Sequence, residues 1–431
     1  MSVVLAFQRF FYYYRQTTNH VTLPRHDFMQ DASTLTSVRR HSGGHKTPVT
    51  TTSESPSPQL NPPSADNTTQ AKEYSRKKIW LGISGTAFFF VLTVLVVSTG
   101  ISAAIEEFAR GFSSNEYVVL LIFVTAFGVL ESVVSFPLSY YSGFYLEHKY
   151  NLSNQTFTKW MWERFKGTLV GIPIGVPILL AFFYCLKNFQ EWWWLPVSGV
   201  LFFFSVVLAR LGPTLIFPLF YKFQPIEDGN LKSKIIALCE RVGMKVEGVF
   251  VFNLSKNTKK ANAAFAGIGK SKRIILGDTL TANFTDEEIE TVFAHELGHY
   301  KLKHIRTMML IGTLSTFLGL YLTAQVYAAS LAWFGFSSID QIAALPLLTL
   351  WLGVYSLVTS PLSNAVSRKH EREADRYAVE LTSNKSAFAN ALRKLATTNL
   401  ADTEPHPLVE FLFYSHPSIE KRIRFIEGTV S

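Results

Sequence analysis

The sequence predicts a mainly α-helical protein that crosses a membrane several times and carries a small α+β domain outside it. The chain has 431 residues, of which 48% are hydrophobic and only 17% are charged, an apolar balance that is unusual for a soluble protein. The apolar residues gather in long runs, and six of these runs are close to the roughly 20 residues that a helix needs to span a bilayer. A polar segment with mixed helix and strand patterns separates the fourth run from the fifth.

Residues 1–75 are predicted to be a disordered polar tail. The stretch from Thr47 to Gln70 is dominated by Thr, Ser, Pro and Asn, which cannot bury a hydrophobic core. The opening segment from Val3 to Tyr14 is aromatic but too short to span a bilayer. It contains Arg9 and lacks a small-residue cleavage site, which argues against a cleaved signal peptide.

Four transmembrane helices are predicted within residues 76–213 and two more within residues 305–364. The first of them, from Ile79 to Ile101, holds no charged residue, which argues against the alternative of a large soluble helical core. The approximate limits of the six spans are 79–102, 116–139, 167–187, 192–213, 305–328 and 342–364.

The basic residues predict how these spans are oriented. Lys and Arg gather before the first span, between the second and third, after the fourth and after the sixth, whereas the intervening loops hold almost none. Because basic loops stay on the cytoplasmic side, both termini and residues 214–304 are predicted to be cytoplasmic. The net charge of +9 is then explained by topology and contact with the lipid bilayer, and no nucleic-acid partner is predicted.

Residues 214–304 are predicted to form a cytoplasmic α+β segment. A helix is expected from Gly229 to Val242, and strands are expected from Val246 to Phe252 and from Arg273 to Leu276. After the sixth span, residues 365–431 are expected to add further cytoplasmic helices, at Ser367 to Leu381, Lys385 to Thr397 and Ser418 to Ile426.

The most informative motif is His-Glu-x-x-His, which runs from His295 to His299. On a helix these two histidines lie one turn apart on the same face, and at that spacing both imidazoles can bind one Zn²⁺. Thr285 followed by three acidic residues is typical of a helix start, which supports a helix here. The alternative is an ordinary amphipathic helix.

A catalytic zinc needs three protein ligands and one open position, so a third ligand must come from elsewhere. Glu371 is the best candidate, because a helix that enters from the sixth span can carry its carboxylate back to the metal. Glu373 is the nearest rival and points to a different face of that helix. Asp375 lies one turn beyond Glu371, where it can accept a hydrogen bond from a ligating imidazole. The alternative for this cluster is a solvated charged helix.

Glu296 is the candidate general base, since a carboxylate beside a zinc-activated water can take its proton and pass it to the leaving amine. His416 and Arg422 are the candidate donors for the developing oxyanion, although His416 is also an ordinary histidine for a helix entry. His304 and His370 are interpreted as residues at the cytoplasmic membrane interface.

This ordered set of motifs resembles the membrane-integrated zinc peptidases of the M48 family, and most closely those of the type I CAAX prenyl protease kind. The resemblance covers roughly residues 79–426. Besides the zinc motif it rests on Asn262-Ala263, Arg273 to Leu280, Ser367-Arg368, Glu371-x-x-Ala374-Asp375 and Ser415-His416-Pro417. It implies that His295, His299 and Glu371 bind one zinc ion per chain, that Glu296 is the base and that Asp375 orients a ligand.

The same resemblance implies a way to bind substrate and a fold. His416 and Arg422 would stabilise the transition state. Asn262 and Ala263 would belong to a strand that binds an extended peptide as an added edge strand. The implied fold is a ring of transmembrane helices around a water-filled internal chamber, with the zinc site at its cytoplasmic end.

The chain departs from the family pattern in two ways. The family has seven spans, whereas six are counted here, with the polar tail in place of the family's first span. Prenyl proteases often carry a longer insert in the catalytic region, whereas here the zinc motif leads into the fifth span with little between. Both differences keep open a compact, bacterial-type homologue with another substrate.

The predicted function is that of an integral membrane zinc metalloendopeptidase, which removes the C-terminal tripeptide of prenylated CAAX proteins with a zinc-activated water. The alternative is a membrane quality-control zinc protease that cuts unprenylated or misfolded membrane proteins. A rival of another class is a membrane transporter or lipid-binding protein with a structural zinc, but no fourth Cys or His has an obvious place. An inactive scaffold is disfavoured by the intact Glu296.

The predicted partners are a peptide or protein substrate, prenylated in the first interpretation, and the lipid bilayer. The predicted location is a multi-pass position with the active site on the cytoplasmic side. The membrane would be the endoplasmic reticulum in a eukaryote and the inner (plasma) membrane in a bacterium.

Overall fold

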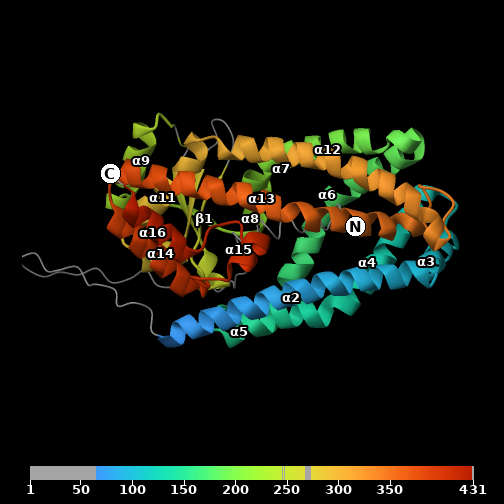
Figure 1. Cartoon of the computed structure of the whole chain (residues 1–431), viewed down its shortest axis with the longest axis horizontal. Helices are drawn as coiled ribbons and strands as arrows, with labels where there is room; N and C mark the ends of the chain where they lie inside the picture. Colours follow the sequence, from blue (N-terminus) through green and yellow to red (C-terminus); the bar gives the residue numbers. More distant parts are fainter. Residues whose placement is uncertain (1–64, 245, 247, 267–272, 430–431) are drawn as a thin grey trace, which may run out of the picture.

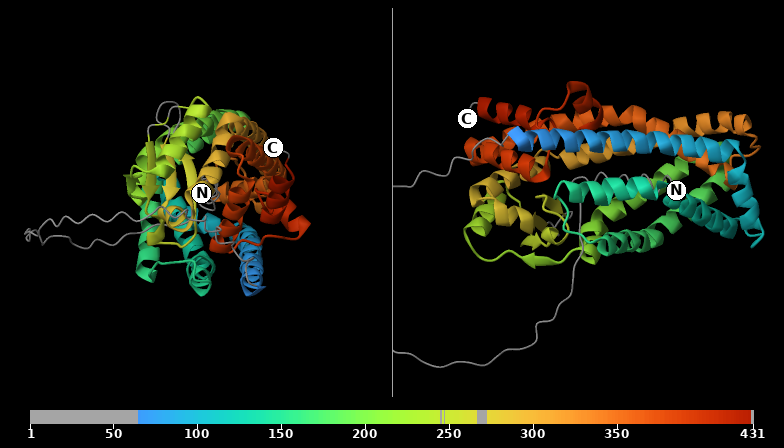
Figure 2. Two further views of the ribbon diagram at one scale, coloured as in Figure 1. Left: turned by 90° about the vertical axis from the view of Figure 1, so that its left-hand side faces the viewer. Right: turned by 90° about the horizontal axis from the view of Figure 1, so that it is seen from below.

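The computed structural model describes residues 65–244, 246, 248–266 and 273–429, so most of the predicted polar tail lies outside the described residues. Long helices run side by side along the molecule, and a small sheet with shorter helices gathers at one end of them (Figures 1 and 2). The predicted mainly α fold with a small α+β unit is confirmed.

Within the described residues, six helical segments are long and apolar enough to cross a membrane, and each overlaps one predicted span. The helices that form them are α2 (Ala65–Ser98), α4 (Glu116–Tyr140), α6 (Phe157–Phe189), α7 (Trp194–Leu211), α12 (His304–Ser330) and α13 (Leu345–Thr382). A hydrophobic core that includes Phe123, Phe183 and Leu347 joins them. The chain is therefore a multi-pass membrane protein, as predicted.

The boundary of the polar tail at residue 75 is wrong, because α2 already begins at Ala65. The reason is that Tyr74 is buried, with its hydroxyl donating a hydrogen bond to Glu147 at 2.6 Å and accepting one from Lys260 at 3.0 Å. These contacts fix the start of the first span against the catalytic half of the chain.

The first span also ends earlier than predicted. Gly100 adopts a left-handed φ of 78°, which stops α2 at Ser98 and starts a separate helix, α3 (Ile101–Arg110), where a loop was expected. Buried Glu106 on α3 accepts a hydrogen bond from the backbone N–H of Ala343 at 2.7 Å, which attaches α3 to the turn before α13. The fourth span continues through a π-helical turn and α8 (Phe217–Phe220), beyond the predicted limit of 213.

The small sheet contains four strands in the order β1-β2-β4-β3, so β3 is an edge strand. Its strands are β1 (Phe223–Pro225), β2 (Gly248–Phe252), β3 (Ala263–Ala266) and β4 (Arg273–Gly277). The two central strands are parallel and are those predicted from alternation, whereas β1 was not predicted. The parallel pair places residues 248–252 beside residues 273–277 and leaves β3 free to pair on its outer side.

The α-helices not yet named are α5 (Leu146–Lys149), α9 (Asn230–Arg241), α10 (Asp278–Asn283), α11 (Asp286–Lys301), α14 (Lys385–Asn399), α15 (Pro407–Phe413) and α16 (Ile419–Gly428). Several of them form a second hydrophobic core with the sheet. Buried side chains from α9, α11, α14 and the sheet meet in this core, including Leu238, Ile274, Phe293 and Phe388. The predicted cytoplasmic helices are confirmed as helices, and α13 runs unbroken from its membrane span into the first of them.

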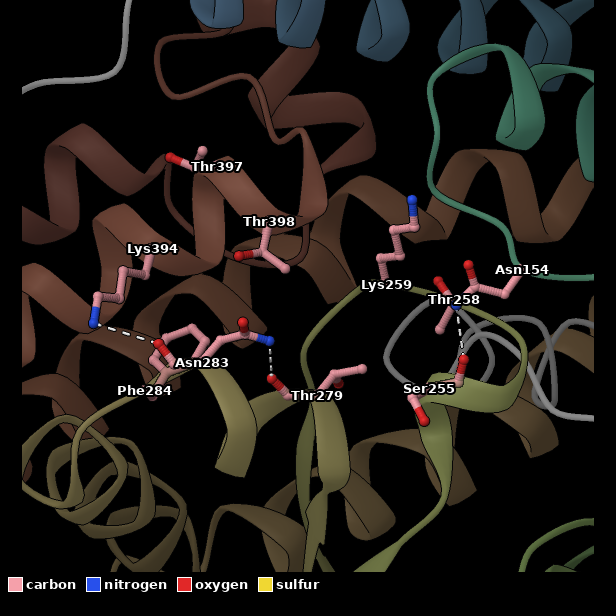
Figure 3. Close-up of a pocket in the computed structure, with 10 residues that line it drawn as sticks. All are labelled: Asn154, Ser255, Thr258, Lys259, Thr279, Asn283, Phe284, Lys394, Thr397 and Thr398. Atoms are coloured by element: carbon pink, nitrogen blue, oxygen red, sulfur yellow. Dashed lines mark hydrogen bonds between the residues drawn. The ribbon is translucent and has the colours of Figure 1, made fainter.

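The loop after α5 docks on the segment that leads to β3. The backbone N–H of Asn154 donates to the carbonyl of Asn257 at 2.7 Å, and the Thr258 hydroxyl donates to the carbonyl of Leu152 at 2.9 Å. A pocket of about 480 Å³ lies at this junction and is lined by residues from α10, α14 and both segments (Figure 3). The membrane helices thus hold the strand that borders the candidate site.

Candidate metal centre

Helix α11 carries the His-Glu-x-x-His motif and begins where the sequence predicts. The Thr285 hydroxyl accepts a hydrogen bond from the Glu288 N–H at 3.3 Å, and the Thr285 N–H donates to the Glu288 carboxylate at 2.9 Å. This capping box satisfies two N–H groups that would otherwise lack a partner. Glu288 also pairs with Lys394 on α14 at 2.7 Å, so the start of α11 is tied to its neighbour.

Helices α11 and α13 cross very closely at Gly298. A Cβ atom at Gly298 would lie only 3.1 Å from the Cα of Ala374 and 3.3 Å from its carbonyl oxygen. Small residues at a crossing let two helix backbones approach in this way. The crossing places His295 and His299 on one helix opposite Glu371 and Asp375 on the other.

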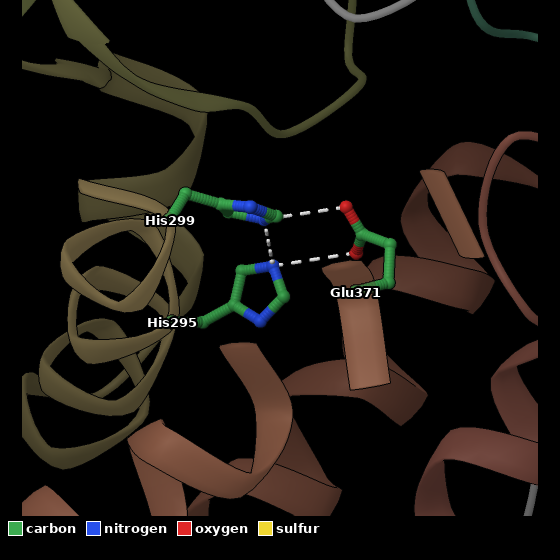
Figure 4. Close-up of side chains that lie close together, drawn as sticks. All are labelled: His295, His299 and Glu371. Carbon is green, nitrogen blue, oxygen red and sulfur yellow. Dashed lines mark hydrogen bonds and ion pairs between the residues drawn. The ribbon is translucent and has the colours of Figure 1, made fainter. Parts of the chain in front are cut away.

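The three predicted ligands converge on one point. The Nε2 atoms of His295 and His299 are 3.1 Å apart, and each lies 3.3 Å from one carboxylate oxygen of Glu371 (Figure 4). Ligands about 2.05 Å from a tetrahedral zinc ion would be separated by about 3.3 Å. The two histidine contacts go to different oxygens of Glu371, so the two imidazole nitrogens and the carboxylate surround one position at separations close to those of ligands that share a zinc ion. A non-protein ligand can complete such a set.

Glu371 gives independent support for a cation at this point. Its carboxylate is buried, and its Oε2 atom accepts no hydrogen bond from any described residue. The charged or ionisable groups nearest this oxygen are His295 Nε2 at 3.3 Å and Arg422 Nη1 at 3.7 Å, and neither donates a hydrogen bond to it. A buried carboxylate oxygen without a hydrogen-bond donor is costly, and a bound cation would satisfy it. Two imidazole nitrogens and a carboxylate are a donor set suited to zinc.

A second carboxylate, that of Asp375, contacts His295 on the side of the ring away from Glu371. Its Nδ1 atom lies 2.8 Å from Asp375 Oδ1, which leaves Nε2 free to face the metal position. Burial acts to lower the pKa of His295, but Glu371 and Asp375 outweigh it and raise this pKa to about 10. The two carboxylates therefore favour positive charge at this imidazole, either as a second proton on the ring or as a bound metal ion.

Arg422 on α16 neutralises the second carboxylate. Its Nε and Nη2 atoms donate to the two oxygens of Asp375 at 2.9 and 2.6 Å, a bidentate pair in a buried position. Burial acts to lower the pKa of Arg422, but Asp375 outweighs this effect and raises the pKa, so the guanidinium stays charged. The structure thus brings Arg422 to the site as the partner of Asp375, with its Nη1 atom 3.7 Å from Glu371.

His416 and Glu296 lie at the more open side of the cluster. The Nε2 atom of His416 is 3.3 Å from Glu371 Oε1, and its side chain is 45% exposed. The Ser415 hydroxyl is 2.9 Å from His416 Nδ1, which can hold the imidazole with Nε2 toward the cluster. Glu296 is partly exposed on α11 and forms no hydrogen bond or ion pair with a described residue, so its carboxylate is available to a substrate or water.

Asn262 and Ala263 lie at the edge strand beside α11. The N–H of Gly277 donates to the carbonyl of Asn262 at 2.9 Å, and a Cβ at Gly277 would lie 2.9 Å from that oxygen, so a glycine is needed there. Because hydrogen-bonded pairs alternate along an antiparallel ladder, the next residue, Ala263, directs its N–H and carbonyl away from β4. These two groups therefore face the outer edge of the sheet.

Three residues near the site have contacts that the sequence analysis did not assign to them. His304 and His370, interpreted as residues at the cytoplasmic membrane interface, are buried, and the Nδ1 atom of His304 lies 3.0 Å from the Nδ1 atom of His299. The Nε2 atom of His304 in turn lies 3.0 Å from Glu373. The signal that could have assigned His304 to the site is its short spacing from the motif, since it follows His299 by five residues.

Two family models match the chain. One is described as peptidase family M48 and matches residues 225–430, and the other is described as CAAX prenyl protease N-terminal, five membrane helices, and matches residues 49–222. The chain is 32% identical over 361 residues to the uncharacterized metalloprotease YhfN of Bacillus subtilis, covering 83% of this chain and 84% of that protein.

The chain is also similar to eukaryotic proteins. It is 33% identical over 326 residues to CAAX prenyl protease 1 of Saccharomyces cerevisiae, covering 71% of this chain and 72% of that protein. Among solved structures it resembles the crystal structure of S. mikatae Ste24p, with a TM-score of 0.76 and 29% identity over 85% of this chain and 92% of that one.

We expect Gly298→Ala to weaken metal binding and to lower the apparent Tm of the detergent-solubilised protein. The added methyl group meets backbone atoms of Ala374, which can move only if the two helices separate. Alanine is otherwise the better helix former by about 1 kcal/mol, so any loss of stability has to come from the crossing.

The matched control is Gly312→Ala on α12, where the new Cβ meets nothing within 4 Å. This control should keep or raise the Tm. Equal metal affinity and Tm for Gly298→Ala and the wild type would contradict the importance of the crossing.

Proposed function

The chain belongs to peptidase family M48 as a membrane metallopeptidase of the CAAX prenyl protease 1 type, and from this premise we propose that it removes the C-terminal tripeptide of prenylated CAAX proteins with a single bound zinc ion. The observation that carries the metal assignment is the convergence of His295, His299 and Glu371, with a buried carboxylate oxygen that accepts no hydrogen bond from a described residue. Three converging protein ligands suit a catalytic site rather than a closed structural one. The rival interpretation as a transporter with a structural zinc is therefore set aside.

The metal position, Glu296 and His416 each have a separate role in the proposed peptide hydrolysis. A zinc ion held there would lower the pKa of a water in its open position and polarise the scissile carbonyl. Glu296 takes a proton from the attacking water and delivers it to the leaving nitrogen as the C–N bond breaks. His416 donates a hydrogen bond to the oxygen that gains negative charge.

In this proposal Asp375 and Arg422 do not contact the substrate and act through the metal ligands. Asp375 keeps the proton of His295 on Nδ1, which leaves Nε2 as the metal ligand. Arg422 neutralises Asp375 and approaches Glu371, so its positive charge keeps two buried carboxylates from repelling each other. Arg422 is thus a positioning residue, because its Nε and Nη2 atoms are committed to Asp375.

The substrate is proposed to lie along β3 as an added antiparallel strand. The outward N–H and carbonyl of Ala263 supply the backbone hydrogen bonds, and Asn262 lies at the start of the same edge. This path runs beside α11, so a bound peptide bond can reach the metal position. The water-filled internal chamber remains a prediction of the resemblance.

The cytoplasmic orientation is proposed from the distribution of basic residues. Under this orientation, the end of the molecule with the sheet and the metal centre faces the cytoplasm, in the endoplasmic reticulum of a eukaryote or the inner membrane of a bacterium. The lipid bilayer then surrounds the six long apolar helices.

One observation favours a second substrate class. Only Leu302 and Lys303 separate α11 from α12, so the catalytic region carries no insert at that point. A compact site of this kind also suits a quality-control protease that cuts unprenylated or misfolded membrane proteins.

Cleavage of a farnesylated Cys-a-a-X peptide beside its unprenylated twin separates these two proposals. The prenyl protease proposal expects that the purified protein cleaves the farnesylated peptide by preference and releases its last three residues. Equal cleavage of both peptides would favour the quality-control alternative, and no cleavage of either would contradict both.

Replacing Glu296 by Gln should lower kcat/KM by about 10²- to 10⁴-fold, because the amide cannot accept a proton. Zinc content should stay at the wild-type level, since Glu296 is not one of the three converging ligands. The matched control is Glu287→Gln, which removes an exposed carboxylate from the first turn of the same helix. Activity of the Glu296 variant within a few-fold of wild type would exclude this carboxylate as the base.

Replacing Ala263 by Pro should raise KM while zinc binding is unchanged. Proline removes the outward N–H that is proposed to pair with substrate, and an edge strand tolerates it because no bond to β4 is lost. Ala263→Val keeps the N–H and serves as the control. A KM unchanged by proline would contradict the proposed peptide path.

A further inference from the structure

The two zinc-binding histidines are supported differently in this chain. His295 contacts its carboxylate directly, through Nδ1 and Asp375 at 2.8 Å. His299 contacts no carboxylate on its Nδ1 side. Instead, that atom lies 3.0 Å from Nδ1 of His304, and Nε2 of His304 lies 3.0 Å from Oε2 of Glu373.

The positions of the protons along this chain of contacts have one consistent assignment. His299 Nε2 faces the metal position, 3.3 Å from Glu371, so its lone pair must be there and its proton on Nδ1. His304 Nδ1 must then accept this proton in a hydrogen bond, which places the proton of His304 on Nε2. That N–H points to Glu373, whose carboxylate is an acceptor.

The backbone and a neighbouring ring hold His304 in this place. Lys303 adopts a left-handed φ of 61° at the start of α12, and the next residue, His304, contacts His299 of the last turn of α11. The imidazole of His370 stacks on that of His304 with ring centroids 4.1 Å apart and planes only 8° from parallel. His304 is buried, so its ring has little freedom to turn.

We propose that His304 and Glu373 position His299 as a zinc ligand, as a relay of two hydrogen bonds from Glu373 to His304 to His299. Helix α13 then supports both zinc histidines, His295 through Asp375 and His299 through Glu373. The relay orients the imidazole of His299 and makes its Nε2 a stronger donor to the metal, as outer carboxylates do for ligating histidines. This inference rests on the proposed zinc site.

His304 and Glu373 could instead hold a second metal ion together with His370, since one ligand atom from each of the three lies within 4.8 Å of the others. The stacking argues against this alternative. Imidazole lone pairs lie in the plane of the ring, so two rings that are nearly parallel and face to face cannot both direct a lone pair at one ion. The relay uses the observed ring positions without any rotation.

The test is the zinc affinity of the purified full chain in detergent, measured by competition with a chromogenic chelator. His304→Ala should raise the zinc Kd by about 10- to 100-fold, as the loss of an outer partner typically does. His304→Asn should recover most of this loss, because its side-chain carbonyl can still accept from His299 Nδ1. Glu373→Gln should give a smaller increase than His304→Ala.

Two controls separate the relay from other roles. Glu380→Gln removes an exposed carboxylate from the same helix and should leave the zinc Kd unchanged. His370→Phe keeps a ring to stack on His304 but no metal-binding nitrogen, and it should leave both the Kd and a stoichiometry of one zinc per chain unchanged.

The relay is overturned if His304→Ala binds zinc within twofold of wild type, or if His304→Asn loses as much as His304→Ala. A second zinc equivalent that disappears in His370→Phe would also overturn it, in favour of a second metal site. A wild-type protein that binds no zinc would overturn the proposed metal centre and the relay together, which distinguishes that failure from a failure of the relay alone.

Discussion

The close crossing of α11 and α13 is the contact on which the candidate site depends. At Gly298 the two backbones come so near that no larger side chain fits without a shift, and His295 and His299 on α11 then face Glu371 on α13. This crossing turns two separate sequence motifs into one ligand set. Because α13 is a single helix of 38 residues, the same contact also couples the site to a membrane span.

The charged groups around the crossing are paired with one another, except that one oxygen of Glu371 accepts no hydrogen bond from a described residue. Asp375 is satisfied by Arg422 and by the proton on His295. Glu371 is buried with one oxygen that accepts no hydrogen bond from a described residue, and a bound cation would supply its partner. The two imidazole nitrogens and this carboxylate therefore face one position that a cation can fill.

Local periodicity accounts for what could be predicted from the sequence. The i, i+4 spacing of His295 and His299 and the capping pattern at Thr285 are properties of one helix, and both are seen in the structure. Glu371 could be preferred over Glu373 because the helix that enters from the sixth span can carry its carboxylate back to the metal, whereas Glu373 points to a different face. The six spans followed from composition alone, and all six appear as helices.

Features that depend on tertiary contacts could not be predicted in the same way. The contact of His304 with His299 depends on the left-handed backbone conformation of Lys303. This conformation could not be predicted, because glycine and not lysine is the residue that usually indicates it. The edge position of β3 depends on the parallel pairing of β2 with β4. The start of α2 at Ala65 depends on the burial of Tyr74 against Glu147, a residue 73 positions away.

X-ray absorption at the zinc edge of the purified protein would test the central claim most directly. The account predicts one zinc with two imidazole nitrogens, a carboxylate oxygen and one further light atom, at about 2.0–2.2 Å. Loss of that signal in a His295→Ala, His299→Ala double variant would place the ion at the α11–α13 crossing. A signal that persists in the double variant, or a sulfur ligand at about 2.3 Å, would contradict the account.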